Sequence, residues 1–378
     1  MKIAIVANTS WYIYKFRVPL MRSLHQAGHQ ILIFAPTDEY TGHLKSEGFE
    51  FASFEFSRSG VNLFGELVVV WRLRNLLIRH KPDVLLTYTP KPNIYAPLAA
   101  RFMKTVVINN ISGMGRIFTE TSLMAFFLIY LYRVALSKSA VVFVQNPDDL
   151  KFFSERSIVD IKKLRLLPGS GVDLDKFHVK RAELSTKRGF EFLFVGRLIE
   201  HKGIRILVEA LQELLLEGYS ISCKVHGQLE VGEGSIPETE VSEWSRLGVI
   251  QYLGYEDDIR PSLWSADCFV FPSYYGEGVP RAALEAASCG LPIITTDSVG
   301  CREVVVDGYN GFSCKPSSRE SLILAMKKVL AMPVNERMEM SLNSRRLVEQ
   351  KFSEGIVIDA YHKALHQIKD FTVKGNLR

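Results

Sequence analysis

The sequence has few cysteines, no low-complexity segment and no long apolar run. Five cysteines occur in 378 residues, all in the second half and none in CxxC spacing. The longest apolar run, Leu123–Leu136, contains Arg133 and is shorter than the roughly 20 residues that a membrane-spanning helix needs. Met1–Val6 enters a strand pattern without the layout of a signal peptide. These features disfavour a disulfide-stapled secreted domain and an integral membrane protein, and we expect a reduced, cytoplasmic chain.

Several catalytic motifs are also missing. The chain has no HExxH, no close Cys/His cluster and no evident Ser-His-Asp set, so we expect no catalytic metal. Asp173-Leu-Asp175 matches the DxD metal pattern, but its segment is rich in Gly and Ser, and a turn or capping role is more common there. The stretch Gly113-Met-Gly-Arg116 contains no GxGxxG, which excludes a dinucleotide fingerprint.

The charge is unevenly distributed between the two halves. Residues 1–183 hold 24 Lys and Arg against 15 Asp and Glu, whereas the remainder holds 22 against 26. A basic half suggests a face for an anionic partner, although a solvated surface without a partner explains the same numbers equally well.

Short, continuous apolar runs alternate with helical patterns along the whole chain. Continuous runs are typical of parallel strands that helices cover on both faces. The runs are Ile3–Ala7, Ile31–Ala35, Val84–Thr87, Val106–Asn109, Val141–Gln145, Leu164–Leu167, Phe192–Gly196, Ile221–His226, Val249–Leu253, Cys268–Pro272 and Ile293–Thr296. Helical stretches between them include Val18–Ala27, Leu63–His80, Ile204–Glu217 and Ser321–Leu330. The pattern predicts two open α/β sheets, divided in the polar stretch after Pro168.

Two cations follow one of the predicted strands. The strand ends at Gly196, and Arg197 and Lys202 precede a helix that begins near Gly203. Cations at a helix start oppose the helix dipole unless they share an anion there. A diphosphate would be such an anion, because Arg offers a bidentate fork and Lys a point charge. Two solvated loop cations are the simpler alternative.

A second polar segment, Glu277-Gly-Val-Pro-Arg-Ala-Ala-Leu-Glu285, follows the strand Cys268–Phe271. Pro280 suits a first helical turn, where backbone N–H groups near Gly278 and Val279 would face an anion. Eight helical residues rise about 12 Å, so the two carboxylates cannot act on one atom and should grip different parts of an extended ligand. For Glu285, which lies among apolar residues, sugar hydroxyls and an internal salt bridge are both possible partners.

These paired motifs, Gly-Arg-x(4)-Lys-Gly and Glu-Gly-x(6)-Glu, resemble glycosyltransferase family 4. The resemblance implies the GT-B architecture, in which two Rossmann-like domains face each other across a cleft, and a reaction that retains anomeric configuration. It implies that Arg197 and Lys202 hold the donor diphosphate, together with Gly196, Gly278 and Val279. It also implies that Glu277 contacts the transferred sugar and Glu285 the ribose hydroxyls. Arg197, Lys202 and Glu277 are the expected catalytic residues.

The same resemblance sets the expected domains. Residues 1–170 would form a membrane-facing acceptor domain, 171–190 a linker and 191–355 the nucleotide-sugar domain. Residues 356–378 would form a helix that returns to the first domain.

The first half is similar to a narrower group. Trp11-Tyr-Ile-Tyr-Lys-Phe-Arg-Val-Pro-Leu20, Ala35–Tyr40 and Phe54–Ser59 look like bacterial transferases that extend lipid-linked oligosaccharides, above all α-1,3-N-acetylgalactosaminyltransferases acting on undecaprenyl-diphosphate sugars. This resemblance implies a UDP-GalNAc or UDP-GlcNAc donor, a polyprenyl-diphosphate-linked saccharide acceptor and a role in O-antigen or other surface-glycan assembly. Lys15, Arg17, Arg58 and Arg116 are the candidate acceptor-binding cations.

The segments Leu123–Leu136 and Val68–Arg79 combine apolar and aromatic residues with arginines. That composition suits helices lying in a bilayer interface, although a core helix explains it equally well. We therefore expect a peripheral protein on the cytoplasmic face of the inner membrane. Other hexose donors, a sugar-nucleotide epimerase on the same scaffold and a non-catalytic nucleotide-sugar-binding protein remain as alternatives. No nucleic-acid motif is present.

Overall fold

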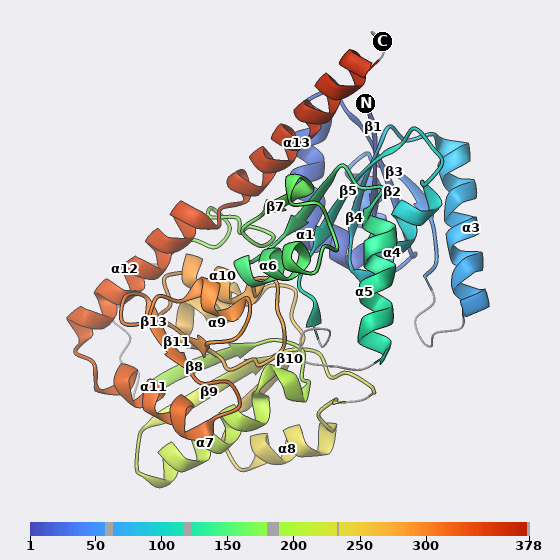
Figure 1. The fold of residues 1–378 in the computed structure, drawn as a ribbon. Helices are drawn as coiled ribbons and strands as arrows, with labels where there is room; N and C mark the ends of the chain where they lie inside the picture. The colour runs from blue at the N-terminus through green and yellow to red at the C-terminus, as the bar shows by residue number, and fades with distance from the viewer. Residues whose placement is uncertain (57–62, 116–122, 180–188, 233, 376–378) are drawn as a thin grey trace. The chain divides into compact units, whose positions relative to one another are not determined.

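The computed structural model describes residues 1–56, 63–115, 123–179, 189–232 and 234–375. The chain forms two compact units (Figure 1). The first contains Met1–Ser170 together with Gly355–Arg378, and the second contains Gly171–Glu354. At the border of the second unit, the Val172 N–H donates to the Phe352 carbonyl at 2.9 Å and the Val172 carbonyl accepts from the Glu354 N–H at 3.0 Å.

The first unit is built on a seven-stranded parallel sheet with the order β3-β2-β1-β4-β5-β6-β7. Its strands are β1 (Lys2–Val6), β2 (Gln30–Ala35), β3 (Glu50–Ser53), β4 (Val84–Tyr88), β5 (Val106–Ile111), β6 (Val141–Val144) and β7 (Leu164–Leu166). Its helices are α1 (Ser10–Gln26), α2 (Thr41–Ser46), α3 (Leu63–His80), α4 (Pro90–Ala99), α5 (Leu123–Leu136), α6 (Pro147–Glu155), the short η2 (Ile161–Lys163) and α13 (Glu354–Gly375). The helices α1, α2 and α13 pack on one face of the sheet, and α3, α4, α5 and α6 pack on the other.

The second unit repeats this architecture with six parallel strands in the order β10-β9-β8-β11-β12-β13. The strands are β8 (Phe190–Val195), β9 (Ile221–His226), β10 (Gln251–Gly254), β11 (Cys268–Phe271), β12 (Ile293–Thr296) and β13 (Gly311–Cys314). The helices are η3 (Glu200–Lys202), α7 (Ile204–Leu216), α8 (Glu238–Arg246), α9 (Arg260–Ser265), α10 (Arg281–Ser288), η4 (Cys301–Val304), α11 (Arg319–Ala331) and α12 (Val334–Lys351). One continuous apolar core spans this unit.

The prediction of two Rossmann-like α/β sheets is therefore confirmed. In both units the strand order reverses direction beside the first strand, between β1 and β4 and between β8 and β11. Ligands of open α/β sheets bind at such switch points, outside the carboxyl ends of the strands. The five cysteines all lie buried in the second unit, and none forms a disulfide.

One predicted helix begins earlier than expected. The sequence pattern placed a helix over Val18–Ala27, whereas α1 starts at Ser10 and continues through Pro19. The Thr9 hydroxyl accepts a hydrogen bond from the Tyr12 N–H at 3.1 Å and caps the earlier start. The aromatic run that follows Ser10 has a low helix propensity, but packing of Ile13 into the core outweighs it.

Candidate functional site

The candidate site lies at the carboxyl ends of β8 and β11, the switch point of the second sheet. These strands are direct neighbours, since Cys268 pairs with Phe192. The chain leaving β8 forms the turn η3, which contains Lys202, and the chain leaving β11 carries Glu277. Two segments separated by about seventy residues thus meet where the sheet topology favours a ligand.

Lys202 and Glu277 form a buried ion pair across this switch point. The Lys202 Nζ donates to Oε1 of Glu277, and only 9% of the lysine side chain and 15% of the glutamate side chain are exposed. The ammonium group also lies 5.3 Å from the centre of the Phe271 ring and 5.4 Å from that of Tyr275. A hydrogen bond from the Ser273 hydroxyl, 3.2 Å long, adds a second donor to the same carboxylate oxygen. The ion pair is therefore mostly buried, between aromatic rings on one side and the Ser273 hydroxyl on the other.

The turn that carries Lys202 is fixed by close backbone packing. Gly203 follows Lys202 with φ of +78°, and a Cβ atom there would lie 2.1 Å from the Pro272 carbonyl oxygen. Only glycine fits such a contact in a left-handed conformation. The His201 carbonyl accepts from the Tyr274 N–H at 3.0 Å, and it shares the single hydroxyl proton of Ser273, 3.3 Å away, with the Glu277 carboxylate. These contacts join the loops after β8 and β11 directly.

The loop after β12 supports the segment with Glu277 in a similar way. Gly300 has φ of +78°, and a Cβ atom there would lie 2.1 Å from the Gly278 carbonyl oxygen and 2.5 Å from that of Glu277. The Ser298 hydroxyl donates to the Ser273 carbonyl at 2.9 Å. Gly278 and Val279, which we expected to offer N–H groups to an anion, are both buried beside this loop.

Glu285 lies inside α10 and forms a salt bridge within the protein. This is one of the two interactions that the sequence allowed for its carboxylate, the other being with sugar hydroxyls. Its Oε1 accepts from Nε of Arg281 at 3.0 Å, and Nη2 of the same arginine lies 3.4 Å from Oε1 of Glu354. All three side chains are about 15% exposed, at 14%, 15% and 16%. Burial raises the pKa of the Glu354 carboxyl, and Arg281 partly offsets that effect. The ribose contact of Glu285 stays a prediction.

Arg197 has a different environment from Lys202. It directly follows Gly196, its side chain is 55% exposed, and Nη1 lies 3.7 Å from Oε1 of Glu230. The structure therefore brings Lys202 and Glu277 into contact and places Arg197 in a separate, solvent-facing ion pair. An exposed pair of this length is weak, so the guanidinium can exchange Glu230 for a bound anion at little energetic cost.

The first unit holds the candidate acceptor-binding residues. Lys15 lies over the Tyr40 ring, with Nζ 5.5 Å from its centre. Arg17 is buried at 1% exposure, and its guanidinium carbon lies 4.2 Å from the centre of the Tyr88 ring. Nη2 of Arg17 donates to the Tyr12 hydroxyl at 2.6 Å. Arg58 and Arg116 lie outside the described residues.

Sequence reasoning missed Ser273, Arg281 and Glu354. Arg281 and Glu285 stand four residues apart on one helix, a spacing that signals an ion pair, whereas the contact with Glu354 depends on the tertiary fold.

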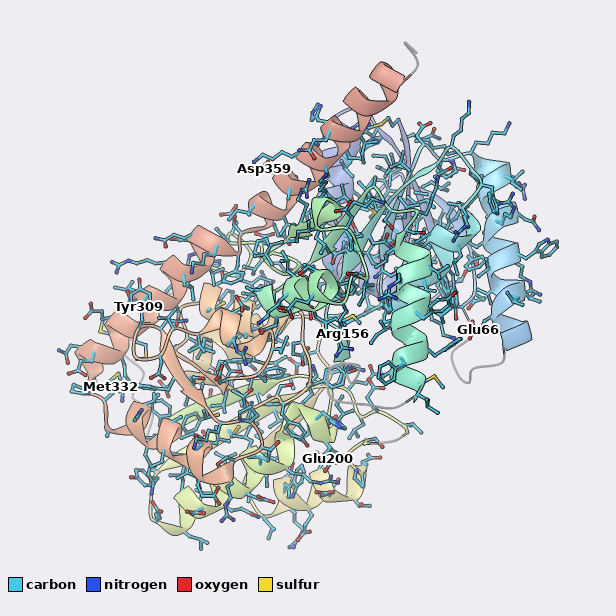
Figure 2. The ribbon with its side chains drawn as sticks, in the orientation of Figure 1. Glu66, Arg156, Glu200, Tyr309, Met332 and Asp359 are labelled. Carbon is cyan, nitrogen blue, oxygen red and sulfur yellow. The ribbon has the colours of Figure 1, made fainter. Side chains whose placement is uncertain are left out.

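The role of Asp173 was predicted correctly as a turn. Its Oδ1 accepts from the N–H groups of Asp175 at 3.0 Å and Lys176 at 2.9 Å. Within the described ranges, no three His, Cys, Asp or Glu side chains are grouped as metal ligands. Figure 2 shows the side chains of both units.

Two protein-family models match the chain, one in each half. Residues 175–347 match the model of glycosyl transferases group 1, and residues 2–146 match the glycosyl transferase 4-like model.

Two relatives share long stretches of sequence with it. A Campylobacter jejuni N,N'-diacetylbacillosaminyl-diphospho-undecaprenol α-1,3-N-acetylgalactosaminyltransferase is 25% identical over 97% of this chain and 99% of its own length. An Escherichia coli UDP-Gal:α-D-GlcNAc-diphosphoundecaprenol α-1,3-galactosyltransferase is 29% identical over 71% of this chain and 72% of its own.

Solved structures share the fold. Sucrose-phosphate synthase from Thermosynechococcus elongatus has a TM-score of 0.81 at 19% identity and covers 98% of this chain and 99% of its own. Anabaena HepE in complex with UDP has a TM-score of 0.77 at 18% identity, covering 97% of this chain and 100% of its own. The architecture is that of the GT-B fold.

Proposed function

Because the chain belongs to the family 4 glycosyltransferases of GT-B fold, we propose that it transfers a sugar from a UDP-sugar to a saccharide linked to undecaprenyl diphosphate. The product would enter an O-antigen or another surface glycan. The Campylobacter and Escherichia relatives are both named for α-1,3 transfer onto undecaprenol-diphosphate-linked sugars, which supports this choice of acceptor.

The observation that carries the proposal is the buried Lys202–Glu277 pair at the β8/β11 switch point. A lysine ammonium group in a mostly buried site interacts more strongly with a developing phosphate charge than the same group would in water. In the proposed donor complex, a diphosphate oxygen takes a place at Lys202, and Glu277 turns toward the hydroxyls of the transferred sugar. Arg197 leaves Glu230 and binds the diphosphate from the solvent side.

The transfer step breaks the bond between the anomeric carbon and the diphosphate oxygen. A bond from the acceptor hydroxyl oxygen to the anomeric carbon forms on the same face of the sugar, which retains the anomeric configuration. The acceptor proton passes to the departing diphosphate, so no protein base is needed. Lys202 and Arg197 stabilise the negative charge that develops on UDP, and we propose that they do so without a metal ion.

We propose an N-acetylhexosamine donor, with UDP-GalNAc as the first choice and UDP-GlcNAc as the second. This choice rests on the named activity of the Campylobacter relative, which matches this chain along almost its whole length. The galactosyl donor of the Escherichia relative shows that similar chains use other hexoses. The acceptor lipid would place the protein at the cytoplasmic face of the inner membrane as a peripheral protein.

A donor screen tests the proposal. The purified chain is incubated with UDP- and GDP-sugars and short polyprenyl-diphosphate saccharides, and the linkage of any product is determined by NMR. We expect an α-linked product from a UDP-N-acetylhexosamine, formed roughly 10²–10³ times more slowly by the Lys202→Ala variant. A β-linked product would contradict the retaining mechanism, and an isomerised sugar nucleotide formed without acceptor would contradict transfer altogether.

A further inference from the structure

The helices α3, α4 and α5 are neighbours among the four that cover one face of the sheet in the first unit. α3 and α5 lie on either side of α4 and both contact it (Figure 1). The inner sides of this layer pack into the core through residues such as Leu73, Leu77 and Ile129. The outer sides carry an unusual number of apolar side chains.

The outer face of α5 is as apolar as the face that packs inward. Its exposed large apolar side chains are Leu123, Met124, Phe126, Phe127 and Tyr130, with exposures of 89%, 49%, 59%, 41% and 59%. Leu123, Phe127 and Tyr130 recur at helical spacing and therefore form one stripe. Arg133 is the single charged residue of the helix. A helix that is apolar on all sides is normally covered by protein or by lipid.

α3 presents a second stripe of the same kind. Leu67, Trp71 and Ile78 follow one another at helical spacing and are 66%, 61% and 49% exposed. Exposed Arg72 and Arg79 lie beside this stripe on the same outer surface. Apolar and aromatic side chains flanked by arginines characterise helices at a bilayer interface.

The segments that contain α3, α4 and α5 are predominantly basic. Residues 63–115 and 123–138 contain nine Lys and Arg and only two acidic residues, Glu66 and Asp83. Glu66, labelled in Figure 2, accepts a hydrogen bond from Lys91 Nζ at 2.7 Å. The Asp83 carboxylate, three residues after α3 ends at His80, is exposed and accepts from the Lys2 N–H at 2.7 Å. Basic side chains thus outnumber acidic ones nine to two in these segments, and this excess favours an anionic partner.

We propose that the outer faces of α3 and α5 form the docking surface of this protein for an anionic lipid bilayer. The apolar stripes enter the boundary between headgroups and acyl chains, and Arg72 and Arg79 bind lipid phosphates. Among the described residues, none of the helices qualifies as a membrane span. The surface extends the proposed function, because it brings the enzyme to its lipid-linked acceptor. Its binding to lipid can be measured without any sugar transfer.

Vesicle flotation with the full chain tests the surface. Vesicles of phosphatidylcholine alone are compared with vesicles of equal parts phosphatidylcholine and phosphatidylglycerol, at about 0.1 M and about 1 M salt. We expect binding to the anionic vesicles that weakens at high salt, where screening shortens the range of the arginine charges from about 10 Å to about 3 Å. We also expect a blue shift of tryptophan fluorescence from Trp71, which is 61% exposed.

The decisive variant is Leu67→Ser with Leu123→Ser, and a matched control is Leu216→Ser with Leu324→Ser. The first pair is 66% and 89% exposed and the control pair, in the second unit, is 89% and 63% exposed, so neither change opens a core cavity. We expect affinity for anionic vesicles to fall about tenfold or more in the first variant, because two apolar insertions are lost, and to stay unchanged in the control.

Three results would overturn the docking surface. The first is that wild-type protein does not bind anionic vesicles at low salt, and the second is that the control variant loses as much binding as the Leu67/Leu123 variant. The third is that the protein without lipid sediments as a dimer and that the Leu67/Leu123 substitutions convert it to a monomer. Transfer to a water-soluble short-chain acceptor separates this proposal from the proposed function. If vesicle binding depends on the two leucines but no sugar is transferred, docking stands and the transferase assignment fails. If the leucine variant transfers sugar normally and wild-type protein does not bind vesicles, the docking surface alone fails.

Discussion

Replacement of Lys202 by methionine removes the ammonium charge while it keeps a flexible side chain against the rings of Phe271 and Tyr275. The partner carboxylate of Glu277 is only 15% exposed and would remain in a mostly buried site without the ammonium group of its ion pair. Removal of one partner from a buried ion pair costs about 3–5 kcal/mol. We therefore expect Lys202→Met to lower the free energy of unfolding by about that amount, as measured by urea denaturation.

The double variant Lys202→Met/Glu277→Gln separates stability from catalysis. A neutral amide needs no countercharge, so most of the lost stability should return. Turnover should not return, because the charge that stabilises the departing diphosphate is still missing. The loss of a comparable electrostatic donor reduces kcat by roughly 10²–10³, and we expect a loss of this size in both variants.

Steady-state release of UDP from the donor measures the turnover of wild type and both variants. Two outcomes would refute the reasoning. In the first, the free energy of unfolding of Lys202→Met differs from that of wild type by less than about 0.5 kcal/mol, a difference typical of surface substitutions. The ion pair would then make no substantial contribution to stability. In the other, the double variant regains wild-type turnover, and Lys202 would have no role in the reaction.

Three further substitutions test other groups. Arg197→Ala should reduce turnover by a similar factor but change stability by less than about 1 kcal/mol, because its contact with Glu230 is exposed and 3.7 Å long; a large loss of stability in thermal unfolding would contradict the solvent-facing position. Arg281→Gln should raise the KM for the donor more than it lowers kcat, since Glu285 loses the arginine that orients it; an unchanged KM would argue against a ribose contact. Burial raises the pKa of Asp149 to about 7, so the stability contributed by its neutral form is present below the unfolded pKa near 4 and is lost as the pH rises through 7. Asp149→Asn should therefore raise the Tm more at pH 8 than at pH 4, and an equal change at both pH values would exclude this titration.

The alternation of apolar runs and helical patterns was sufficient to predict two parallel sheets, because interior strands such as β4 and β11 are buried along their whole length. Two edge strands were missed. β3 is half exposed with the sequence Glu-Phe-Ala-Ser, and β13 begins with a glycine. Exposure weakens the apolar signal of β3, whereas β13 is mostly buried and its four residues Gly-Phe-Ser-Cys form no continuous apolar run.

In the candidate site, too, some features follow from local sequence and others depend on the tertiary fold. The separation predicted for Glu277 and Glu285 from eight helical residues started the helix too early, because α10 begins at Arg281 and Glu277 lies in the loop before it. The contact between Lys202 and Glu277 depends on two loops that meet only through the adjacency of β8 and β11. The pairing of Arg281 with both Glu285 and Glu354 depends on the packing of α10 against the end of the second unit. Local sequence patterns carry no information about such long-range contacts.

The most direct test of the transferase assignment measures free UDP and elongated lipid-linked saccharide in the same reaction. With UDP-N-acetylhexosamine and a polyprenyl-diphosphate saccharide, we expect the two products to form in equal amounts, to require the acceptor, and to decrease together by roughly 10²–10³ in Lys202→Met. UDP release without elongation, or conversion of the donor to an isomeric sugar nucleotide in the absence of acceptor, would contradict a glycosyltransferase with its donor site at Lys202 and Glu277.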